Sequence, residues 1–356
     1  MSAALITPAT PEQLADAVRS APRVVVVGAG TKPRLAQVAD TFARISTAKL
    51  RGIVEYEPSE FTFTALAGTP LREIAAALAD KGQYLPFEPM LAGAGATLGG
   101  TVAAGLSGPG RFRFGGLRDF ILGVRFVDGE GRLLRLGGKV VKNAAGFDVP
   151  KFLVGGLGRF GGLAEITFKV FPRPTALRTL RIDAADDAAK LRILTAAGGA
   201  RWELDALDTV VGQPAVLARI GGPPAALDAL CAEILGRFPG RALADDAAAE
   251  VWRGATEFAW APAAGALAKF ALTPAQTPEF SAWVRSLPGG CGWIGAGGNV
   301  GYASAGAGAN LSAAPWPGVT LRGHGPLWLG PQRTPAIAGA VKHALDPQGR
   351  FPALND

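Results

Sequence analysis

The chain has 356 residues, of which 49% are hydrophobic and 8% aromatic, which is enough for two hydrophobic cores and excludes a disordered protein. Its two cysteines, Cys231 and Cys291, can build neither a disulfide framework nor the ligand set of an iron–sulfur cluster.

The net charge of +7 is concentrated in residues 111–173, which hold twelve Lys or Arg against five Asp or Glu. No helix-turn-helix, zinc-finger or aromatic RNA-binding signature accompanies this charge, so we expect no nucleic acid partner. A flavin diphosphate, an acidic small substrate or an acidic partner surface would explain it.

The first residues predict a helix, a buried strand and a glycine turn. Thr10 is a suitable N-cap, with proline at the first helical position and Gln13 at the capping-box position. The run RVVVV at residues 23–27 predicts a buried strand, and residues 28–32 follow it directly. A strand followed by a glycine turn is typical of a phosphate-binding loop, and a plain strand-to-helix turn is the alternative. The NAD-binding Rossmann fingerprint is rejected, because Pro33 replaces its third glycine and no suitable acidic residue precedes Glu55.

Two long uncharged windows, residues 89–110 and 286–321, need testing as membrane spans. The first contains seven glycines and two prolines and the second ten glycines, which disfavour a spanning helix, so we predict loops and short strands. The N-terminus lacks a basic region followed by an apolar core, which argues against secretion and favours a cytoplasmic location.

Helix and strand patterns alternate irregularly along residues 1–175, which favours an α+β fold over a doubly wound sheet. The predicted elements are strands at 52–57 and 61–67, a helix from 69 to 82, a hairpin of 120–127 and 132–136, and a strand at 166–171. Beyond residue 175 the composition changes, which predicts a second domain. Its elements are alanine-rich helices at 186–197, 225–238 and 245–258, strands at 209–211 and 269–272, and a closing helix within 334–351 that begins at Thr334-Pro335.

The stretch AGAGATLGGTVAAGLS at residues 92–107 suits a dinucleotide diphosphate. Glycines let backbone N–H groups approach phosphate oxygens without obstruction from a Cβ atom. The arginine-containing run GPGRFRFGGLRDFILG follows directly and can neutralise the phosphate charge. The alternative is that a chain with 49 glycines has glycine-rich loops throughout.

Together these pieces resemble the vanillyl-alcohol-oxidase, or PCMH-type, FAD-binding domain. The resemblance rests on GAGTKP, LPFEPMLAGAGATLGGTVAAGLSGPGR, GGLRDFILGVRFVDGEG, GGKVVKNAAGFDVPKFLVGGLGRFGGLAEITFKVFPRP and KHALDPQGRF. The run KNAAGFD is the most discriminating, because it is the local signature of the glycolate oxidase and D-lactate dehydrogenase branch. More narrowly, the chain is similar to the FAD-binding subunits of bacterial three-subunit glycolate oxidases. The likeness covers about the first 175 residues, and the second domain only by layout and the terminal motif.

The resemblance implies an α+β architecture in three parts. These are a PCMH-type FAD-binding domain of two α+β subdomains at residues 1–175, a smaller α+β cap domain at 176–325, and a C-terminal helix and tail at 326–356 that pack back on the FAD domain. The implied cofactor-binding residues are Gly28, Ala29, Gly30, Thr31, Lys32, Gly95, Ala96, Thr97, Gly99, Gly100, Ala103, Ser107, Gly108, Gly161 and Leu163. Thr97 and Ser107 can hydrogen-bond phosphate or flavin atoms, or they can satisfy loop backbone instead. Gly161 and Leu163 lie where the family reads GIIT and this chain reads GGLA.

The chain also departs from the family in ways that affect its chemistry. Some relatives attach the flavin through a histidine in the diphosphate loop, whereas this chain has Lys32 there, so we expect FAD to bind without a covalent link. We expect no metal site. The closing motif reads FPAL after the glycine-arginine pair, where relatives continue as NPGK or NPGR, which leaves a contact of the tail with flavin open. Arg118 or Lys142 can face the flavin phosphate or an anionic substrate, whereas Asp119 and Asp148 suit an ion pair that holds the loop.

Oxidation of a 2-hydroxy acid needs a base near the reacting carbon or hydroxyl and a cation for the carboxylate. The catalytic subunits of the superfamily carry a histidine pair in the cap, and the matching region here has none. The candidates are therefore His324 and Arg322, with a lysine, Tyr302 or a carboxylate as possible substitutes for the base. A lone histidine beside glycines is more often solvated, and His343 on the closing helix is expected to be exposed.

Three functions follow from this resemblance. The first is the FAD-binding subunit of a glycolate oxidase complex, which oxidises glycolate to glyoxylate and passes electrons to an iron–sulfur subunit beside a paralogous catalytic flavin subunit. The second is a stand-alone FAD-dependent oxidoreductase of D-lactate type, and the third a scaffold subunit with a vestigial flavin site. The expected location is cytoplasmic, with peripheral membrane association through partners left open.

Overall fold

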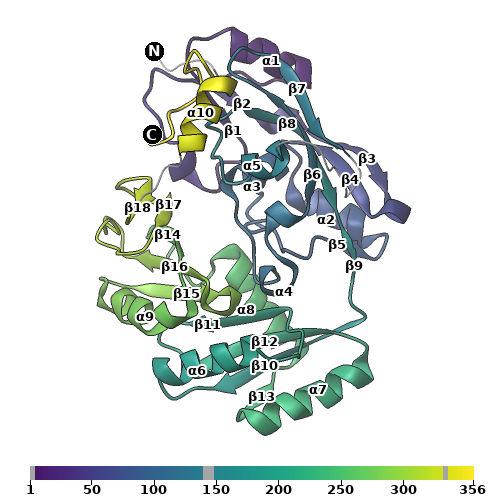
Figure 1. Cartoon of the computed structure of the whole chain (residues 1–356), viewed down its shortest axis with the longest axis vertical. Coiled ribbons are helices and arrows are strands. Elements are labelled where there is room, and N and C mark those ends of the chain that lie inside the picture. Colours follow the sequence, from purple (N-terminus) through teal and green to yellow (C-terminus); the bar gives the residue numbers. More distant parts are fainter. Residues whose placement is uncertain (1–4, 139–147, 332–335) are drawn as a thin grey trace. The chain divides into compact units, whose positions relative to one another are not determined.

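The computed structural model describes residues 5–138, 148–331 and 336–356 (Figure 1). The chain divides into two compact units. Unit 1 comprises Met1–Leu106, Gly116–Pro172 and Arg333–Asp356, and unit 2 comprises Ser107–Gly115 and Arg173–Gln332. Unit 1 is therefore assembled from three separate stretches of chain, and a short part of the predicted domain 1–175 belongs to unit 2.

Unit 1 contains two small sheets and one larger antiparallel sheet. Strands β1 and β2 pair in parallel, β5 pairs with β9, and the five-stranded sheet has the order β3-β4-β8-β6-β7. The helices and 3₁₀ turns are α1 (Pro11–Arg19), η1 (Pro33–Ala36), η2 (Thr47–Lys49), η3 (Pro58–Glu60), α2 (Leu71–Ala79), α3 (Leu98–Ala104), η4 (Leu117–Asp119), α5 (Val149–Leu153) and α10 (Ala336–Leu345). The strands are β1 (Val24–Val27), β2 (Ala43–Ser46), β3 (Ile53–Glu57), β4 (Thr62–Leu66), β5 (Gln83–Tyr84), β6 (Ile121–Val127), β7 (Leu133–Gly137), β8 (Gly162–Lys169) and β9 (Phe171–Pro172).

These elements confirm most of the strands and helices predicted for unit 1. Thr10 caps α1 by accepting a hydrogen bond from the Gln13 amide at 3.2 Å. The core of the five-stranded sheet is aromatic, since the ring of Phe87 lies 5.3 Å from that of Phe120 and 5.7 Å from that of Phe168. The predicted cap residues of the closing helix, 334 and 335, lie outside the described residues, and α10 begins at Ala336.

One prediction for unit 1 is wrong, because residues 89–110 were expected to form loops and short strands and instead contain α3. The Thr97 side chain caps this helix by accepting from the Gly100 amide, and Gly105 ends it in the left-handed conformation with φ +60°. Leu98 and Val102 are fully buried. Burial of these side chains offsets the helix cost of two glycines, each about 1 kcal/mol.

Unit 2 is built on an antiparallel sheet of nine described strands in the order β13-β10-β12-β11-β15-β16-β14-β17-β18. Helices α6 and α7 bury one hydrophobic cluster against this sheet, and α9 buries a second one. The helices and 3₁₀ turns are α4 (Arg111–Phe114), α6 (Asp187–Gly198), α7 (Pro224–Arg237), α8 (Asp245–Glu257), η5 (Pro274–Gln276), α9 (Thr277–Ser286) and η6 (Ala296–Gly298). The strands are β10 (Ala176–Asp183), β11 (Ala206–Val210), β12 (Ala215–Gly222), β13 (Gly240–Ala242), β14 (Ala266–Ala271), β15 (Cys291–Gly295), β16 (Val300–Ala305), β17 (Gly318–Arg322) and β18 (Trp328–Leu329).

The three predicted alanine-rich helices are confirmed as α6, α7 and α8, and the two predicted strands lie in β11 and β14. Among the described residues, no helix has the length and apolar character that crossing a membrane requires.

Candidate functional site

The loop after β1 leaves several backbone donors without an acceptor. None of the amides of residues 29–32 donates a hydrogen bond to any residue that the structure describes. The ammonium group of Lys32 donates to Thr31 Oγ1 at 2.9 Å, and no described carboxylate pairs with it. Lys32 is only 8% exposed, and this burial lowers its pKa to about 8. A run of free amides beside a buried ammonium group favours an anion at this loop.

The start of α3 lies against this loop. A Cβ atom on Gly28 would overlap the hydroxyl oxygen of Thr97. That oxygen also accepts from the Gly100 amide at 3.3 Å, so Thr97 satisfies loop backbone and has its hydroxyl proton left to donate. The two glycine-containing segments that the sequence analysis singled out are therefore in contact.

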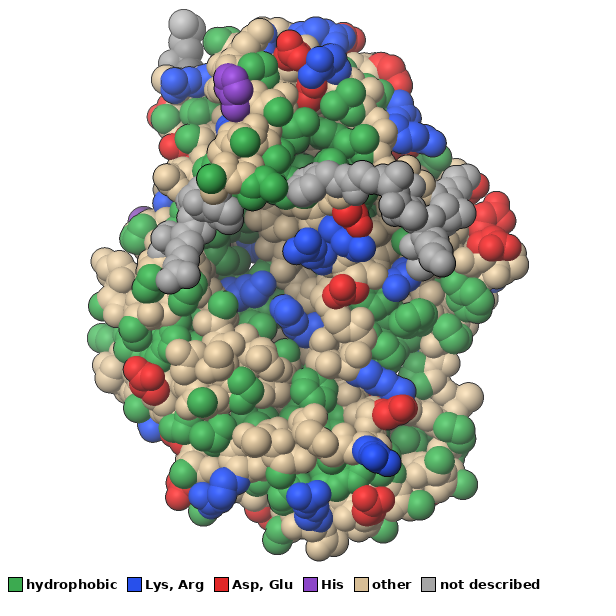
Figure 2. Space-filling model, in the orientation of Figure 1, with side chains coloured by type: hydrophobic (Ala, Val, Ile, Leu, Met, Phe, Trp, Pro, Cys, Tyr) green, Lys and Arg blue, Asp and Glu red, His purple; other side chains and the backbone are tan. Residues whose placement is uncertain are grey.

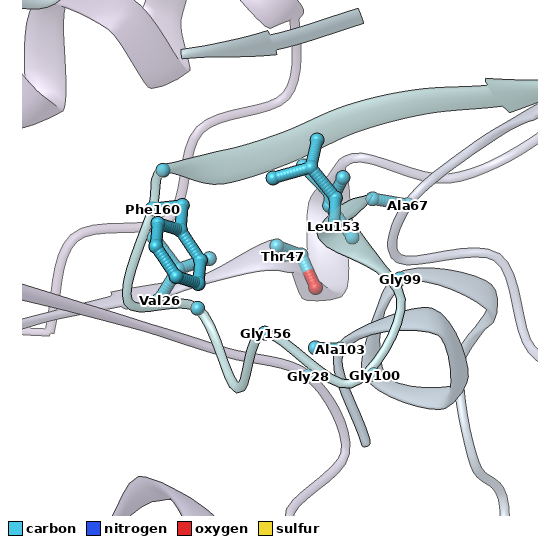
Figure 3. A pocket seen from close by; sticks show the side chains of 13 residues that line it. Val26, Gly28, Thr47, Ala67, Gly99, Gly100, Ala103, Leu153, Gly156 and Phe160 are labelled. Atoms are coloured by element: carbon cyan, nitrogen blue, oxygen red, sulfur yellow. The ribbon is translucent and has the colours of Figure 1, made fainter. Parts of the chain in front are cut away.

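Two adjoining hollows lie in unit 1 around this contact, and they share Val26, Gly28, Gly100, Ala103 and Gly158. The first, called the loop hollow, is lined by residues 26–32 together with parts of η1, α3 and the loop before β8. The second, called the apolar hollow, is drawn in Figure 3. Figure 3 shows the Phe160 ring on one side of it, the Leu153 side chain on another, and the Thr47 hydroxyl pointing inward.

Eleven of the predicted cofactor-binding residues line one or both hollows. They are Gly28, Ala29, Gly30, Thr31, Lys32, Thr97, Gly99, Gly100, Ala103, Gly161 and Leu163. The Gly99 amide donates to Ala67 O at 2.7 Å, so Gly99 contributes shape rather than a hydrogen-bond donor.

Gly95, Ala96, Ser107 and Gly108 line neither hollow. The amides of Gly95 and Ala96 close their own loop by donating to Ala92 O at 3.1 Å and Leu91 O at 2.9 Å. Ser107 and Gly108 belong to unit 2. Backbone turns that close on themselves leave no donor for a ligand.

Several lining residues were not predicted as site residues. Val26, Thr47, Leu153, Gly158 and Phe160 all line one or both hollows. The run FLVGGLGRF contains three of them, and its glycine density was a signal that could have found them.

Several basic side chains of residues 111–173 form ion pairs within their own unit. Arg132 pairs with Asp128 at 2.7 Å, Arg113 with Asp205 at 2.9 Å, and Arg125 with Glu165. On the face that Figure 2 shows, blue Lys and Arg side chains alternate with red Asp and Glu side chains. Part of the positive charge in this segment therefore serves structural ion pairs rather than a binding surface.

Four charged residues in and before the KNAAGFD run were considered for a role in binding or in ion pairs. Asp119 accepts from the Gly116 amide at 2.8 Å, and Asp148 caps α5 and pairs with Lys151 at 2.9 Å, so both hold the backbone locally. Arg118 is exposed. Lys142 and the rest of the run up to Phe147 lie outside the described residues.

Unit 2 brings together polar side chains that were not predicted as a group. Lys269 on β14 lies directly opposite Tyr302 on β16. Burial, and secondarily the positive charge of Arg111 on α4, lowers the pKa of Lys269 to about 8. The guanidinium of Arg111 forms no ion pair with any residue that the structure describes, and burial raises the pKa of the Tyr302 hydroxyl. Arg111 and Lys269 thus place positive charge beside Tyr302, and the carboxylate of Asp208 also acts on this hydroxyl.

The two predicted catalytic candidates differ in their surroundings. Arg322 donates from Nε to Gly265 O at 2.8 Å and from Nη2 to Pro262 O at 2.6 Å, so its guanidinium holds a turn. His324 and His343 are exposed, as expected for solvated side chains. His324 belongs to unit 2 and His343 to unit 1.

Comparisons with known proteins agree with this geometry. Residues 2–137 match the family model described as "FAD binding domain". The chain is 42% identical over 196 residues to the glycolate oxidase subunit GlcE of Escherichia coli (strain K12), a match that covers 55% of this chain and 54% of GlcE. It is 31% identical over 196 residues to the glycolate oxidase subunit GlcD of Bacillus subtilis (strain 168), over 52% of this chain and 40% of GlcD. The chain thus matches about half the length of these curated relatives, or less.

Among solved structures, an alkyldihydroxyacetonephosphate synthase matches with a TM-score of 0.70 and 15% sequence identity. This match covers 97% of this chain and 75% of that chain, and at such low identity it bears on the fold alone. Together with the family match, it confirms the predicted α+β, PCMH-type fold.

Proposed function

We propose that this chain, whose residues 2–137 match the family model of an FAD binding domain, is the FAD-carrying subunit of a glycolate oxidase (glycolate dehydrogenase) complex. The similarity to GlcE at 42% identity supports the substrate class. In this proposal glycolate is oxidised to glyoxylate, and electrons pass through the flavin to an iron–sulfur partner subunit. A paralogous catalytic flavin subunit is the second partner.

The observation that carries the proposal is the loop hollow. The free amides of residues 29–32 and the Lys32 ammonium group face one side of it, which suits the two negative charges of a dinucleotide diphosphate. The adjoining apolar hollow, with Leu153 and Phe160, suits one of the flat ring systems of the same cofactor. Gly28 and Gly100 line both hollows, and neither carries a side chain that would separate the two hollows.

In this arrangement the chain's own residues bind and orient the cofactor. Amides of the loop hold the phosphate oxygens, Lys32 neutralises charge, and Thr97 donates its remaining hydroxyl proton. When bound, FAD supplies the two-electron acceptor for removal of hydride from a 2-hydroxy acid. Lys32 replaces the histidine by which some relatives attach flavin, so we propose non-covalent binding.

We also propose a cytoplasmic location, with access to the inner face of the cell membrane through the partner subunits. The test of the cofactor proposal is the flavin content of the purified chain. We expect about one FAD per chain, released in full by acid or heat. A colourless protein that takes up no FAD would support the third function, a scaffold subunit with a vestigial site.

A second function, a stand-alone oxidoreductase of D-lactate type, is favoured by one observation. In this second function, Arg111 and Tyr302 in unit 2 hold the carboxylate of a 2-hydroxy acid, and the neutral amine of Lys269, whose pKa is about 8, acts as the base. Anaerobic mixing of the FAD-loaded chain with excess glycolate or D-lactate separates the two functions. Persistence of the oxidised flavin spectrum for minutes supports the subunit function, and bleaching within seconds supports the stand-alone enzyme.

A further inference from the structure

Arg159 has an unusual environment for an arginine. It lies between α5 and β8, is 1% exposed, and is the largest fully buried side chain among the described residues. All of its hydrogen bonds go to main-chain oxygens, and its Nε has no partner in the described part of the chain. Burial lowers the pKa of Arg159 to about 10, and the negative charge of Asp356 opposes this shift. Burial of a guanidinium group is costly, and the hydrogen bonds to three separate segments offset part of that cost.

The guanidinium connects the two walls of the loop hollow. Nη1 donates to Leu35 O at 3.0 Å and to Leu157 O at 2.5 Å, and both leucines line that hollow. Leu35 belongs to η1, directly after the loop of residues 28–32, whereas Leu157 lies in the glycine-rich loop before β8. One nitrogen atom thus joins segments that are distant in sequence.

The same residue also joins the hollow to the C-terminal segment. Nη2 donates to Asp356 O at 2.6 Å, and the Arg159 carbonyl accepts from Lys342 Nζ at 2.6 Å. Lys342 in turn donates to Asp346 Oδ2 at 2.6 Å and to Phe351 O at 3.1 Å. A continuous set of hydrogen bonds therefore runs from the walls of the loop hollow to residues 342–356.

We propose that Arg159 is a positioning residue of the cofactor site, which holds the walls of the loop hollow in place and couples FAD binding to docking of residues 342–356. The inference rests on the proposed binding of FAD in the loop hollow. Lysine cannot replace arginine here, because a single ammonium nitrogen cannot reach the oxygens that Nη1 and Nη2 of Arg159 contact in Leu35, Leu157 and Asp356.

Three variants of the full-length chain test the positioning role. Arg159→Met removes both the charge and the branched guanidinium group, Arg159→Lys keeps the charge and removes the guanidinium group, and Arg51→Met is the control. Arg51 forms an ion pair with Glu73 within unit 1, lines neither hollow and lies outside residues 342–356. Each apoprotein is prepared, its melting temperature is recorded, and its Kd for FAD is measured by quenching of flavin fluorescence.

We expect the Kd for FAD to rise at least tenfold in both Arg159 variants and less than threefold in Arg51→Met, because Arg51 contacts neither the hollow walls nor residues 342–356. Full affinity in Arg159→Lys would overturn the proposal, because charge alone would then be sufficient. Unchanged affinity in Arg159→Met would overturn it as well. A wild-type chain that binds no FAD would instead contradict the proposed function.

The coupling can be tested without any substitution. By thermodynamic reciprocity, FAD should stabilise the docked state of residues 342–356 if docking strengthens FAD binding. We expect amide hydrogen exchange in residues 342–356 of the wild-type chain to slow at least threefold when FAD is added. Slower exchange in residues 28–36 without any change in 342–356 would overturn the coupling while leaving FAD binding intact.

Discussion

Gly28 lies so close to Thr97 that a Cβ atom at position 28 would occupy the place of the Thr97 hydroxyl oxygen. This contact fixes the end of β1 against the start of α3, and both segments line the loop hollow. The loop after β1 can therefore approach α3 this closely only because residue 28 is a glycine.

The change Gly28→Ala tests this contact. We expect the methyl group to displace the Thr97 side chain, loosen its cap on the Gly100 amide and raise the Kd for FAD at least tenfold. The measurement is fluorescence titration of the apoprotein. Gly254→Ala is the control, because a Cβ at that helical position in α8 meets no atom within 4 Å and should leave the Kd unchanged. Equal affinity in Gly28→Ala and wild type would show that the contact does not shape the FAD site.

Lys32 predicts how FAD affinity depends on pH. Burial lowers the pKa of Lys32 to about 8 in the apoprotein, and a bound diphosphate would raise it again. Binding therefore takes up a proton above about pH 8, so the Kd should be flat between pH 6 and 7.5 and rise by up to tenfold per pH unit above 8. Lys32→Met should bind FAD more weakly at pH 7 and lose this dependence. A pH-independent wild-type Kd up to pH 9.5 would contradict the role of Lys32.

The lowered pKa of Lys32 weakens FAD binding as the pH rises above 8, but it should make the apoprotein more stable over the same range. Because the folded pKa of Lys32 lies below the unfolded value of 10.5, the unfolded chain binds more protons between about pH 8 and pH 10.5. The Lys32 contribution to the free energy of unfolding should therefore increase over this range. Comparing urea unfolding of wild type and Lys32→Met at pH 7.5 and 9.5 isolates this contribution, which should favour wild type more at the higher pH.

Asp208 predicts a structural effect in unit 2. Its carboxylate accepts from Trp293 Nε1 at 2.7 Å and from the Ala296 amide at 3.1 Å. Asp208→Asn turns an amide donor toward one of these donors, so we expect a loss of about 1–3 kcal/mol in the free energy of unfolding. The measurement is urea unfolding followed by tryptophan fluorescence. Asp183→Asn, which removes an exposed carboxylate beside Arg181, is the control and should cost less than half as much.

Arg111 and Lys269 predict binding of small carboxylates by unit 2. Since both cations lie near Tyr302, Arg111→Met and Lys269→Met should each weaken binding of oxalate at least fivefold in isothermal titration. Binding to wild type should also weaken above about pH 8, where Lys269 loses its proton. Arg192→Met, at an exposed position of α6, should bind oxalate like wild type. Absence of oxalate binding to wild type would remove the support for a stand-alone enzyme.

Local patterns predicted the single elements of this fold well. Thr10-Pro11 marked the start of α1, and the turn DGEG marked the β6–β7 hairpin, because caps and turns depend on residues adjacent in sequence. Helix α3 was missed, because its stability comes from burial of Leu98 and Val102, which a glycine-rich composition conceals.

The candidate site was predictable only in part. Glycine runs and the family resemblance pointed to eleven residues that line the hollows, namely residues 28–32, Thr97, Gly99, Gly100, Ala103, Gly161 and Leu163. They also pointed to four that line neither, namely Gly95, Ala96, Ser107 and Gly108. The chemistry of Arg159 and of Lys269 was not predictable, because it depends on partners from distant segments. In Arg159 those partners are Leu35 O and Asp356 O, and no local pattern connects them.

The assembly of unit 1 from three separate stretches has a consequence for synthesis on the ribosome. The amide of Val24 in β1 donates to Arg350 O at 2.8 Å, so the first strand needs a partner that is synthesised more than 300 residues later. Unit 2, by contrast, uses no residue beyond Gln332. The segments of unit 2 are therefore all available before those of unit 1 are complete. In the cell, unit 1, which contains the proposed flavin site, would then be completed after unit 2.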